Sequence, residues 1–152
     1  MSLSVWLSLI SPAVAVLVAV WGFRRSTRAD RLRAFFDLHE RYLAAEVRAG
    51  RRILHQLVAG RSPEQLAELD RATLDRVGYT LAVLNSIAIA CAGGYVDRKL
   101  VRRSMGRSYA SAVAAAQPYL DRVQAQRGYR PYPFAEALAA ELREGAHVES
   151  RD

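Results

Sequence analysis

The pattern of apolar and polar positions divides the chain sharply at Phe23. No charged residue occurs from Leu3 to Phe23, whereas Arg24 and Arg25 follow immediately. A continuous helix over this segment would extend about 31 Å at roughly 1.5 Å per residue, which matches the hydrocarbon thickness of a bilayer. The pattern therefore predicts a transmembrane anchor over residues 1–23.

The flanks of this segment predict its orientation. Basic residues that follow a span favour the cytoplasmic side, so we expect a single pass through the inner (plasma) membrane, with the N-terminus outside and the remaining chain cytoplasmic. Trp6 and Trp21 lie close to the two ends, where aromatic rings prefer the headgroup level, and are predicted membrane-interface anchors. Two alternatives stay open. One is a signal peptide, although no Lys or Arg precedes Leu3; the other is a buried core helix.

A basic juxtamembrane collar, residues 24–33, follows the apolar segment. It holds five arginines and one aspartate, which is +4 of the net charge of +7. Contact with anionic lipid accounts for this charge at roughly 1 kcal/mol per basic residue, and it disfavours nucleic acid as the explanation of the high pI. The residues predicted to contact lipid headgroups are Arg24, Arg25, Arg28, Arg31 and Arg33.

Residues 34–143 are predicted to form a small helical bundle, and residues 144–152 a flexible tail. Apolar residues recur at three- and four-residue steps from Leu32 to Val58, which indicates a long amphipathic helix. No Pro or Gly interrupts the chain between Phe23 and Arg48. The anchor is therefore expected to run straight into this helix.

Four more helical segments complete the expected all-α fold. Ser62, Pro63 and Gln65 form a capping box at a helix start, and Gly93-Gly94 indicates a helix stop. A short segment from Asp97 to Met105 precedes an alanine-rich helix over residues 107–127, which Pro118 should kink or split. The last short helix is expected from Phe134 to Arg143.

Residues 77–96 form a second uncharged stretch, which allows two interpretations. Its length would permit another membrane span. It is, however, interrupted by small and polar residues such as Asn85 and Ser86, and the basic residues after Asp97 would then lie outside, against the positive-inside bias. We favour the central helix of a bundle over a second span.

The sequence offers no constellation for catalysis or for a metal or cofactor. Cys91 is the single cysteine, so no intrachain disulfide or zinc site assembles. The three histidines (His39, His55 and His147) have no ligand spacing, and no glycine-rich phosphate loop is present. The serines of one helical segment (Ser104, Ser108 and Ser111) have no histidine near them in sequence to act as a base. We therefore expect no enzymatic activity and no cofactor.

Two further segments each fit a functional and a structural interpretation. Asp97, Arg98, Arg102 and Arg103 fit an anion site, but more simply a solvated helix face. The aromatic and proline segment over residues 128–134 fits a recognition motif for a proline-binding domain, but more simply a strap whose rings pack on the bundle.

Three motifs follow the span and collar: Phe35-Phe36-Asp37-Leu38-His39-Glu40-Arg41-Tyr42, then Gly94-Tyr95-Val96-Asp97 before Leu100-Val101, then Gln117-Pro118-Tyr119-Leu120 followed by Arg122, Arg127 and Gly128. In this order they resemble an uncharacterised bacterial family of membrane-anchored helical proteins, DUF4760. The family's Asn-aromatic-aromatic-Glu cluster is absent, because the corresponding stretch is Ala82-Val83-Leu84-Asn85. The resemblance implies an anchored cytoplasmic helical domain and no reaction.

Two functions from different classes follow as hypotheses. The first is a membrane-anchored binding or scaffolding module that contacts anionic lipid and a protein partner or a second copy of itself. The second is a toxin-like or defence-related membrane effector, or a regulator, in which residues 77–96 enter the bilayer.

Overall fold

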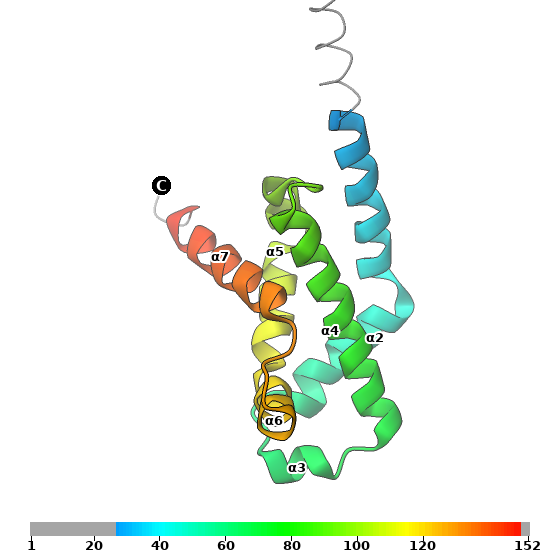
Figure 1. The fold of residues 1–152 in the computed structure, drawn as a ribbon, viewed down its shortest axis with the longest axis vertical. Coiled ribbons are helices and arrows are strands. Elements are labelled where there is room, and N and C mark those ends of the chain that lie inside the picture. Colours follow the sequence, from blue (N-terminus) through cyan, green and yellow to red (C-terminus); the bar gives the residue numbers. More distant parts are fainter. Residues whose placement is uncertain (1–26, 150–152) are drawn as a thin grey trace, which may run out of the picture.

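The computed structural model describes residues 27–149, and all regular secondary structure in that range is helical (Figure 1). The all-α prediction is confirmed for this part of the chain. The apolar segment, Trp6, Trp21, Arg24 and Arg25 lie outside the described residues. After a first helix over residues 27–43, the elements are α2 (Ala45–Ile53), the π-helical turn η1 (Leu54–Val58), α3 (Pro63–Ala67), α4 (Arg71–Ala92), α5 (Arg98–Ala115), α6 (Gln117–Arg127) and α7 (Pro133–Glu149).

The expected long helix from Leu32 to Val58 is wrong, because the chain turns at Ala44. This residue has an extended ψ of 145°, so α2 leaves in a new direction from the first helix (Figure 1). The guanidinium of Arg48 donates a hydrogen bond to the carbonyl of Leu43 at 2.9 Å, which pairs one acceptor that the break leaves free. No Pro or Gly marks the position, so local sequence gave no signal for it.

Several predicted helix boundaries are confirmed by their caps. The amide of Gln65 donates to the Ser62 hydroxyl, the Gln65 side chain accepts from the Ser62 amide, and Pro63 opens α3. Helix α4 ends at Ala92, directly before Gly93, and Gly94 has the left-handed φ of 73° that favours glycine.

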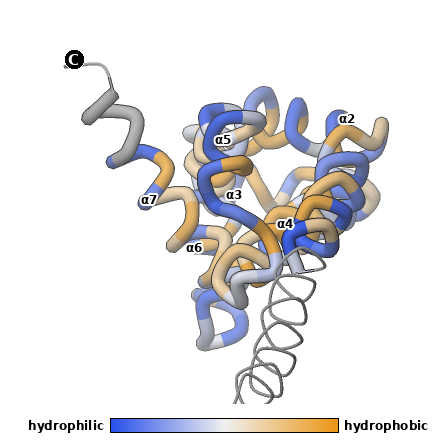
Figure 2. The backbone as a smooth tube through the Cα atoms, turned by 90° about the horizontal axis from the view of Figure 1, so that it is seen from above, coloured by the Kyte–Doolittle hydropathy of each residue, from blue (hydrophilic) through white to orange (hydrophobic). Residues whose placement is uncertain are grey.

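Helix α4 is the central element of the described bundle. It packs against α2 on one side and α7 on another, and α7 also packs against α5. Figure 2 shows hydrophobic stretches along α4 and along α7, which lies at one side of the molecule in this view. The fully buried side chains of α4 are Val77, Thr80, Leu81, Leu84 and Ile87.

Helix α4 is also the one helix among the described residues that is long and apolar enough to cross a membrane. Its most apolar window is 39% buried within the protein. A membrane span and the core helix of a soluble protein both meet this criterion of length and composition.

The C-terminal half differs from expectation in where its helices break. Helix α5 is continuous through Gly106, where two segments were expected. Gly106 is buried, and a β-carbon placed on it would lie 3.5 Å from the side chain of Leu142 in α7. Pro118 splits the chain as predicted, since α5 ends at Ala115 and Pro118 lies in the first turn of α6. Helix α7 continues to Glu149, beyond the expected end at Arg143.

The aromatic and proline segment packs only partly on the bundle. Pro131 is buried, and the hydroxyl of Tyr132 donates to the carbonyl of Gly78 at 3.2 Å. Tyr129 and Phe134 are 55% and 47% exposed. The predicted strap is therefore confirmed at its centre and not at its ends.

Candidate functional site

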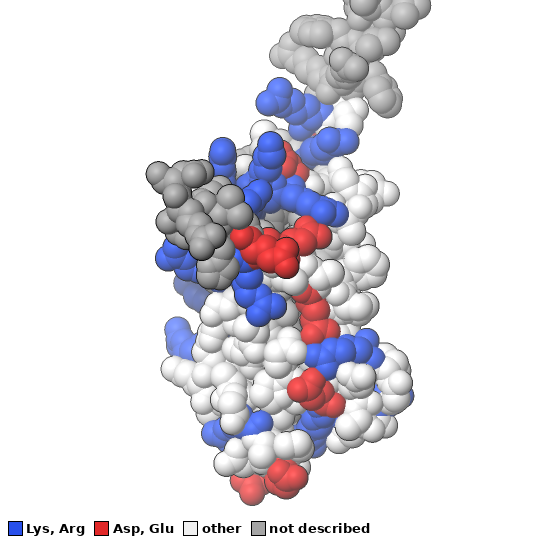
Figure 3. Space-filling view, turned by 90° about the vertical axis from the view of Figure 1, so that its left-hand side faces the viewer, with Lys and Arg blue, Asp and Glu red and all other residues white. Residues whose placement is uncertain are grey.

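The strongest candidate site is a basic groove at the end of the bundle where the first helix begins. It lies between that helix, the C-terminal end of α4 and the first turns of α5. We call it the basic groove. Its lining residues are Thr27, Arg28, Arg31, Leu32, Cys91, Gly94, Val96, Asp97, Arg98, Lys99, Leu100 and Arg103. Figure 3 shows Lys and Arg side chains gathered at this end of the molecule around a hollow in the surface.

The fold builds the groove by placing two basic segments at the same end. The first helix contributes Arg28 and Arg31, which are three residues apart and therefore share a face. The turn after α4 reverses the chain, so the first two turns of α5 bring Lys99 and Arg103 beside them. Arg33 is exposed on the same helix but does not line the groove.

Hydrogen bonds fix the α5 side of the groove. The Asp97 carboxylate accepts from the Lys99 amide at 2.8 Å and so caps the helix. Arg98 donates from Nε to the carbonyl of Cys91 at 3.4 Å and from Nη1 to the carboxylate of Glu141 at 3.1 Å. Asp97 and Arg98 are thus committed to the protein itself.

The other four basic side chains of the groove are available. Arg28, Arg31, Lys99 and Arg103 are exposed, and none forms an ion pair with another residue that the structure describes. The remaining wall is apolar, made of Leu32, Val96 and Leu100 beside Cys91. A groove with this lining suits an amphiphile with an anionic head.

Sequence spacing had joined Arg102 with Asp97, Arg98 and Arg103 in one possible anion cluster. The structure separates them, because Arg102 lines a second groove and Arg103 borders both. The sequence could not show that the first helix supplies the other half of the basic groove, since that depends on how the helices pack.

The second groove brings a histidine to the serines of α5. It is lined by His55, Arg102, Arg103, Ser104, Met105, Gly106, Arg107, Ser108 and Ser111. The sequence did not predict that His55 and these serines line one groove. The Ser104 hydroxyl donates to the Leu100 carbonyl at 2.8 Å, and among the described hydrogen bonds none joins His55 to a serine.

Ser108 instead belongs to a polar cluster that sequence analysis missed. Arg51 donates from Nη1 to the Tyr42 hydroxyl at 2.5 Å and to the Ser108 hydroxyl at 2.7 Å, and the two hydroxyls lie 2.7 Å apart. The guanidinium carbon of Arg51 lies 4.0 Å from the centre of the Tyr42 ring. The cluster ties the first helix to α2 and α5, so its role is structural.

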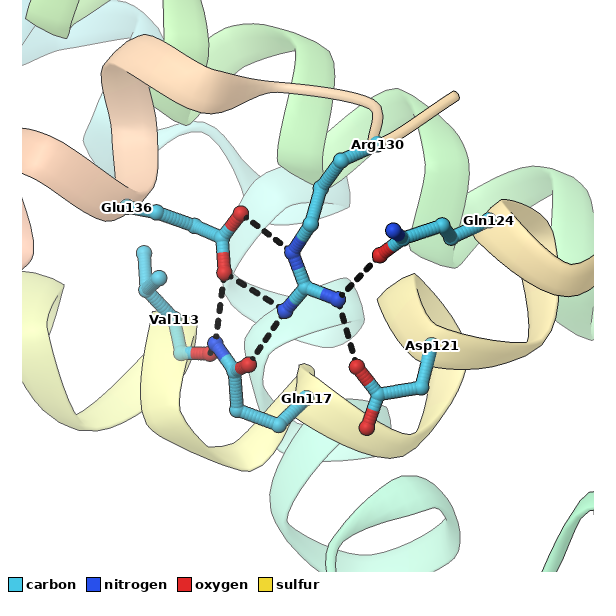
Figure 4. A network of polar contacts seen from close by, with 6 residues as sticks. All are labelled: Val113, Gln117, Asp121, Gln124, Arg130 and Glu136. Atoms are coloured by element: carbon cyan, nitrogen blue, oxygen red, sulfur yellow. Dashed lines mark hydrogen bonds and ion pairs between the residues drawn. The ribbon is translucent and has the colours of Figure 1, made fainter. Parts of the chain in front are cut away.

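A second missed cluster centres on Arg130, between α6 and α7 (Figure 4). Arg130 donates to both carboxylate oxygens of Glu136 at 2.7 and 2.8 Å, and to Asp121 at 2.5 Å. Gln117 and Gln124 accept at 2.6 and 3.0 Å. These bonds raise the pKa of Arg130 and lower that of Glu136. These five hydrogen bonds use all five N–H donors of Arg130, so the cluster is a clamp between α6 and α7.

The described residues contain no cluster of His, Cys, Asp and Glu side chains that could hold a metal ion. Cys91 is buried, and burial raises the pKa of its thiol to about 11, which is unfavourable for thiolate chemistry at neutral pH.

Comparison with protein families matches residues 9–142 to a family described as a domain of unknown function, DUF4760. Comparisons with curated proteins and with solved structures give no significant match.

Proposed function

Since the chain belongs to the DUF4760 family, a domain of unknown function, we propose that it is a helical binding module held at the cytoplasmic face of the inner membrane. The apolar segment from Leu3 to Phe23 is the anchor. The described helices form the domain beneath it, which contacts anionic lipid through its basic end and a partner through its other surfaces.

The observation that carries this proposal is the meeting of two basic segments, residues 28–33 and 98–103, at the end of the bundle where the first helix begins. That end is the one from which the chain leads back to the apolar segment. Each basic residue close to an anionic surface contributes roughly 1 kcal/mol, and screening limits the effect to about 8–10 Å from the surface. Placement of both segments at one end is therefore what a membrane-facing surface requires.

The first helix also supports the binding part of the proposal. Phe36 and Leu43, which do not line the basic groove, are 58% and 45% exposed. Their spacing of seven residues places them along one side of the helix. We propose that this stripe contacts a protein partner or a second copy of the chain.

A photo-crosslinker at Phe36, with Glu64 of α3 as the control position, separates adducts of the chain with itself from adducts with another protein.

Topology mapping tests the anchor and the orientation together. Reporters fused after residue 70 and after residue 152 should both lie in the cytoplasm. A cysteine placed at Asn85 in a Cys91→Ser background should be protected by protein packing in isolated membranes, and it should become accessible to thiol reagents when urea unfolds the domain. A C-terminal reporter on the outer face would contradict the proposal.

The second candidate is the effector whose α4 enters the bilayer. The observation in its favour is the length and apolar character of α4. Its weakness is that α4 packs against α2 and α7 within the described bundle, and these contacts would have to break. In topology mapping this candidate requires the reporters after residues 70 and 152 to lie on opposite sides.

A further inference from the structure

We propose that the basic groove is a binding site for the headgroup of one anionic phospholipid, with the phosphate between the first helix and α5. The inference rests on the proposed function, because it needs the groove to face the membrane. It goes further by replacing a diffuse basic collar with a defined site and by dividing the basic residues into two classes.

Charge is the first argument. Five basic side chains and one acidic side chain line the groove. Asp97 is used as the cap of α5, and Arg98 is paired with Glu141. Exposed cations from two elements line the groove, among them Arg31 of the first helix and Arg103 of α5. Neither forms an ion pair with another described residue. A phosphate held between them can accept from both sides at once.

The apolar wall is the second argument, and it selects a lipid over a soluble phosphate compound. Leu32 and Leu100 line the groove beside the cations. Leu32 is 48% exposed, and the adjoining Tyr95 is 68% exposed. Apolar side chains next to a phosphate site give no benefit to inorganic phosphate, whereas they can pack against the glycerol and upper acyl region of a phospholipid.

The two classes of arginine provide the test. Arg31 and Arg103 line the groove, whereas Arg33 and Arg102 lie on the same two segments, are equally exposed by class, and do not line it. The double variants Arg31→Gln/Arg103→Gln and Arg33→Gln/Arg102→Gln remove the same charge from the same segments. Because all four side chains are exposed, both variants should keep the far-ultraviolet circular dichroism and melting temperature of the wild type.

The full chain is reconstituted in phosphatidylcholine nanodiscs that contain spin-labelled phosphatidylglycerol, and the motionally restricted fraction of that lipid is measured. The groove variant should lower the preference for phosphatidylglycerol over spin-labelled phosphatidylcholine by roughly fivefold or more, and the control variant should change it by less than about twofold. Inorganic phosphate, added at constant ionic strength, should not displace the lipid.

Each other outcome overturns a specific part. Equal losses in both variants would refute the groove and leave the diffuse basic surface of the proposed function intact. No loss in either variant would refute both. Displacement by inorganic phosphate would show a soluble-phosphate site in place of a lipid site.

Discussion

A β-carbon placed on Gly50 would lie 1.8 Å from the hydroxyl oxygen of Thr80 and 2.9 Å from its Cβ. Helices α2 and α4 thus touch through a glycine, and both residues are buried. The Thr80 hydroxyl has no hydrogen-bond partner among the described residues. Position 50 requires glycine because a β-carbon there would clash with the side chain of Thr80 in α4.

The variant Gly50→Ala should therefore destabilise the full chain by about 1–3 kcal/mol, because the new methyl group forces α2 away from α4. Thermal unfolding in detergent measures the change. Gly106→Ala is the matched control, since its Cβ would meet Leu142 at an ordinary 3.5 Å; we expect it to be neutral or to stabilise by up to about 1 kcal/mol. Adding Thr80→Ala to Gly50→Ala should restore part of the loss. Equal effects of the two glycine variants would contradict the close contact.

Arg130 should be intolerant even of lysine. The variant Arg130→Lys keeps the charge but cannot reproduce the planar arrangement of donors to Glu136, Asp121 and Gln117, so we expect a loss of about 1–3 kcal/mol. Arg127→Lys, at the last residue of α6, is the control, because Arg127 is exposed and donates to the Tyr129 hydroxyl, at 3.3 Å; its expected change is within about 0.5 kcal/mol. Chemical denaturation of both variants under one condition decides the point.

The same clamp predicts a pH dependence. The hydrogen bond from Arg130 is the main cause of the lowered pKa of Glu136, with a smaller contribution from Gln117. Because the folded-state pKa lies below the ordinary value of 4.5, the ionised carboxylate stabilises the fold at neutral pH. This stabilisation is lost as the pH falls below 4.5 and through the lowered pKa. Unfolding measured from pH 7 to about pH 3 should show a shallower acid loss in Glu136→Gln than in the wild type. Parallel curves would exclude this carboxylate as a source of acid sensitivity.

Asn85 should act as a cap for another helix. Its side-chain oxygen accepts from the amide of Ala135 in the first turn of α7, at 3.1 Å. Asn85→Ala should destabilise by about 1 kcal/mol and raise amide exchange at the start of α7. Ser86→Ala is the control, because the Ser86 hydroxyl is exposed and bonds only to the Ala82 carbonyl of its own helix. If exchange at α7 is unchanged in Asn85→Ala, the cap has no energetic weight.

The features that the sequence predicted well are those set by local chemistry. The Ser62 capping box, the stop at Gly93-Gly94 and the split at Pro118 each depend on residues within one turn of one another. The turn at Ala44 lacks such a signal, because alanine favours helix and only the packing of α2 requires the break. The basic groove was likewise invisible, since its halves at Arg31 and Arg103 meet only after α4 and its turn have reversed the chain. For the same reason, the collar could not be divided into arginines that line the groove and those that do not.

We propose that the groove end of the bundle faces the membrane, and the depth of each end of the domain can be measured directly. Helix α4 has 22 residues and separates the two ends of the domain, which makes it about 33 Å long at roughly 1.5 Å per residue. Fluorophores are placed on Tyr95→Cys, beyond its C-terminal end, and on Glu64→Cys, in α3 before its start, each in a Cys91→Ser background of the full chain in anionic vesicles. Energy transfer to an acceptor at the lipid headgroups should be strong from position 95 and weak from position 64. Equal transfer from both positions, or stronger transfer from position 64, would contradict a membrane-facing groove.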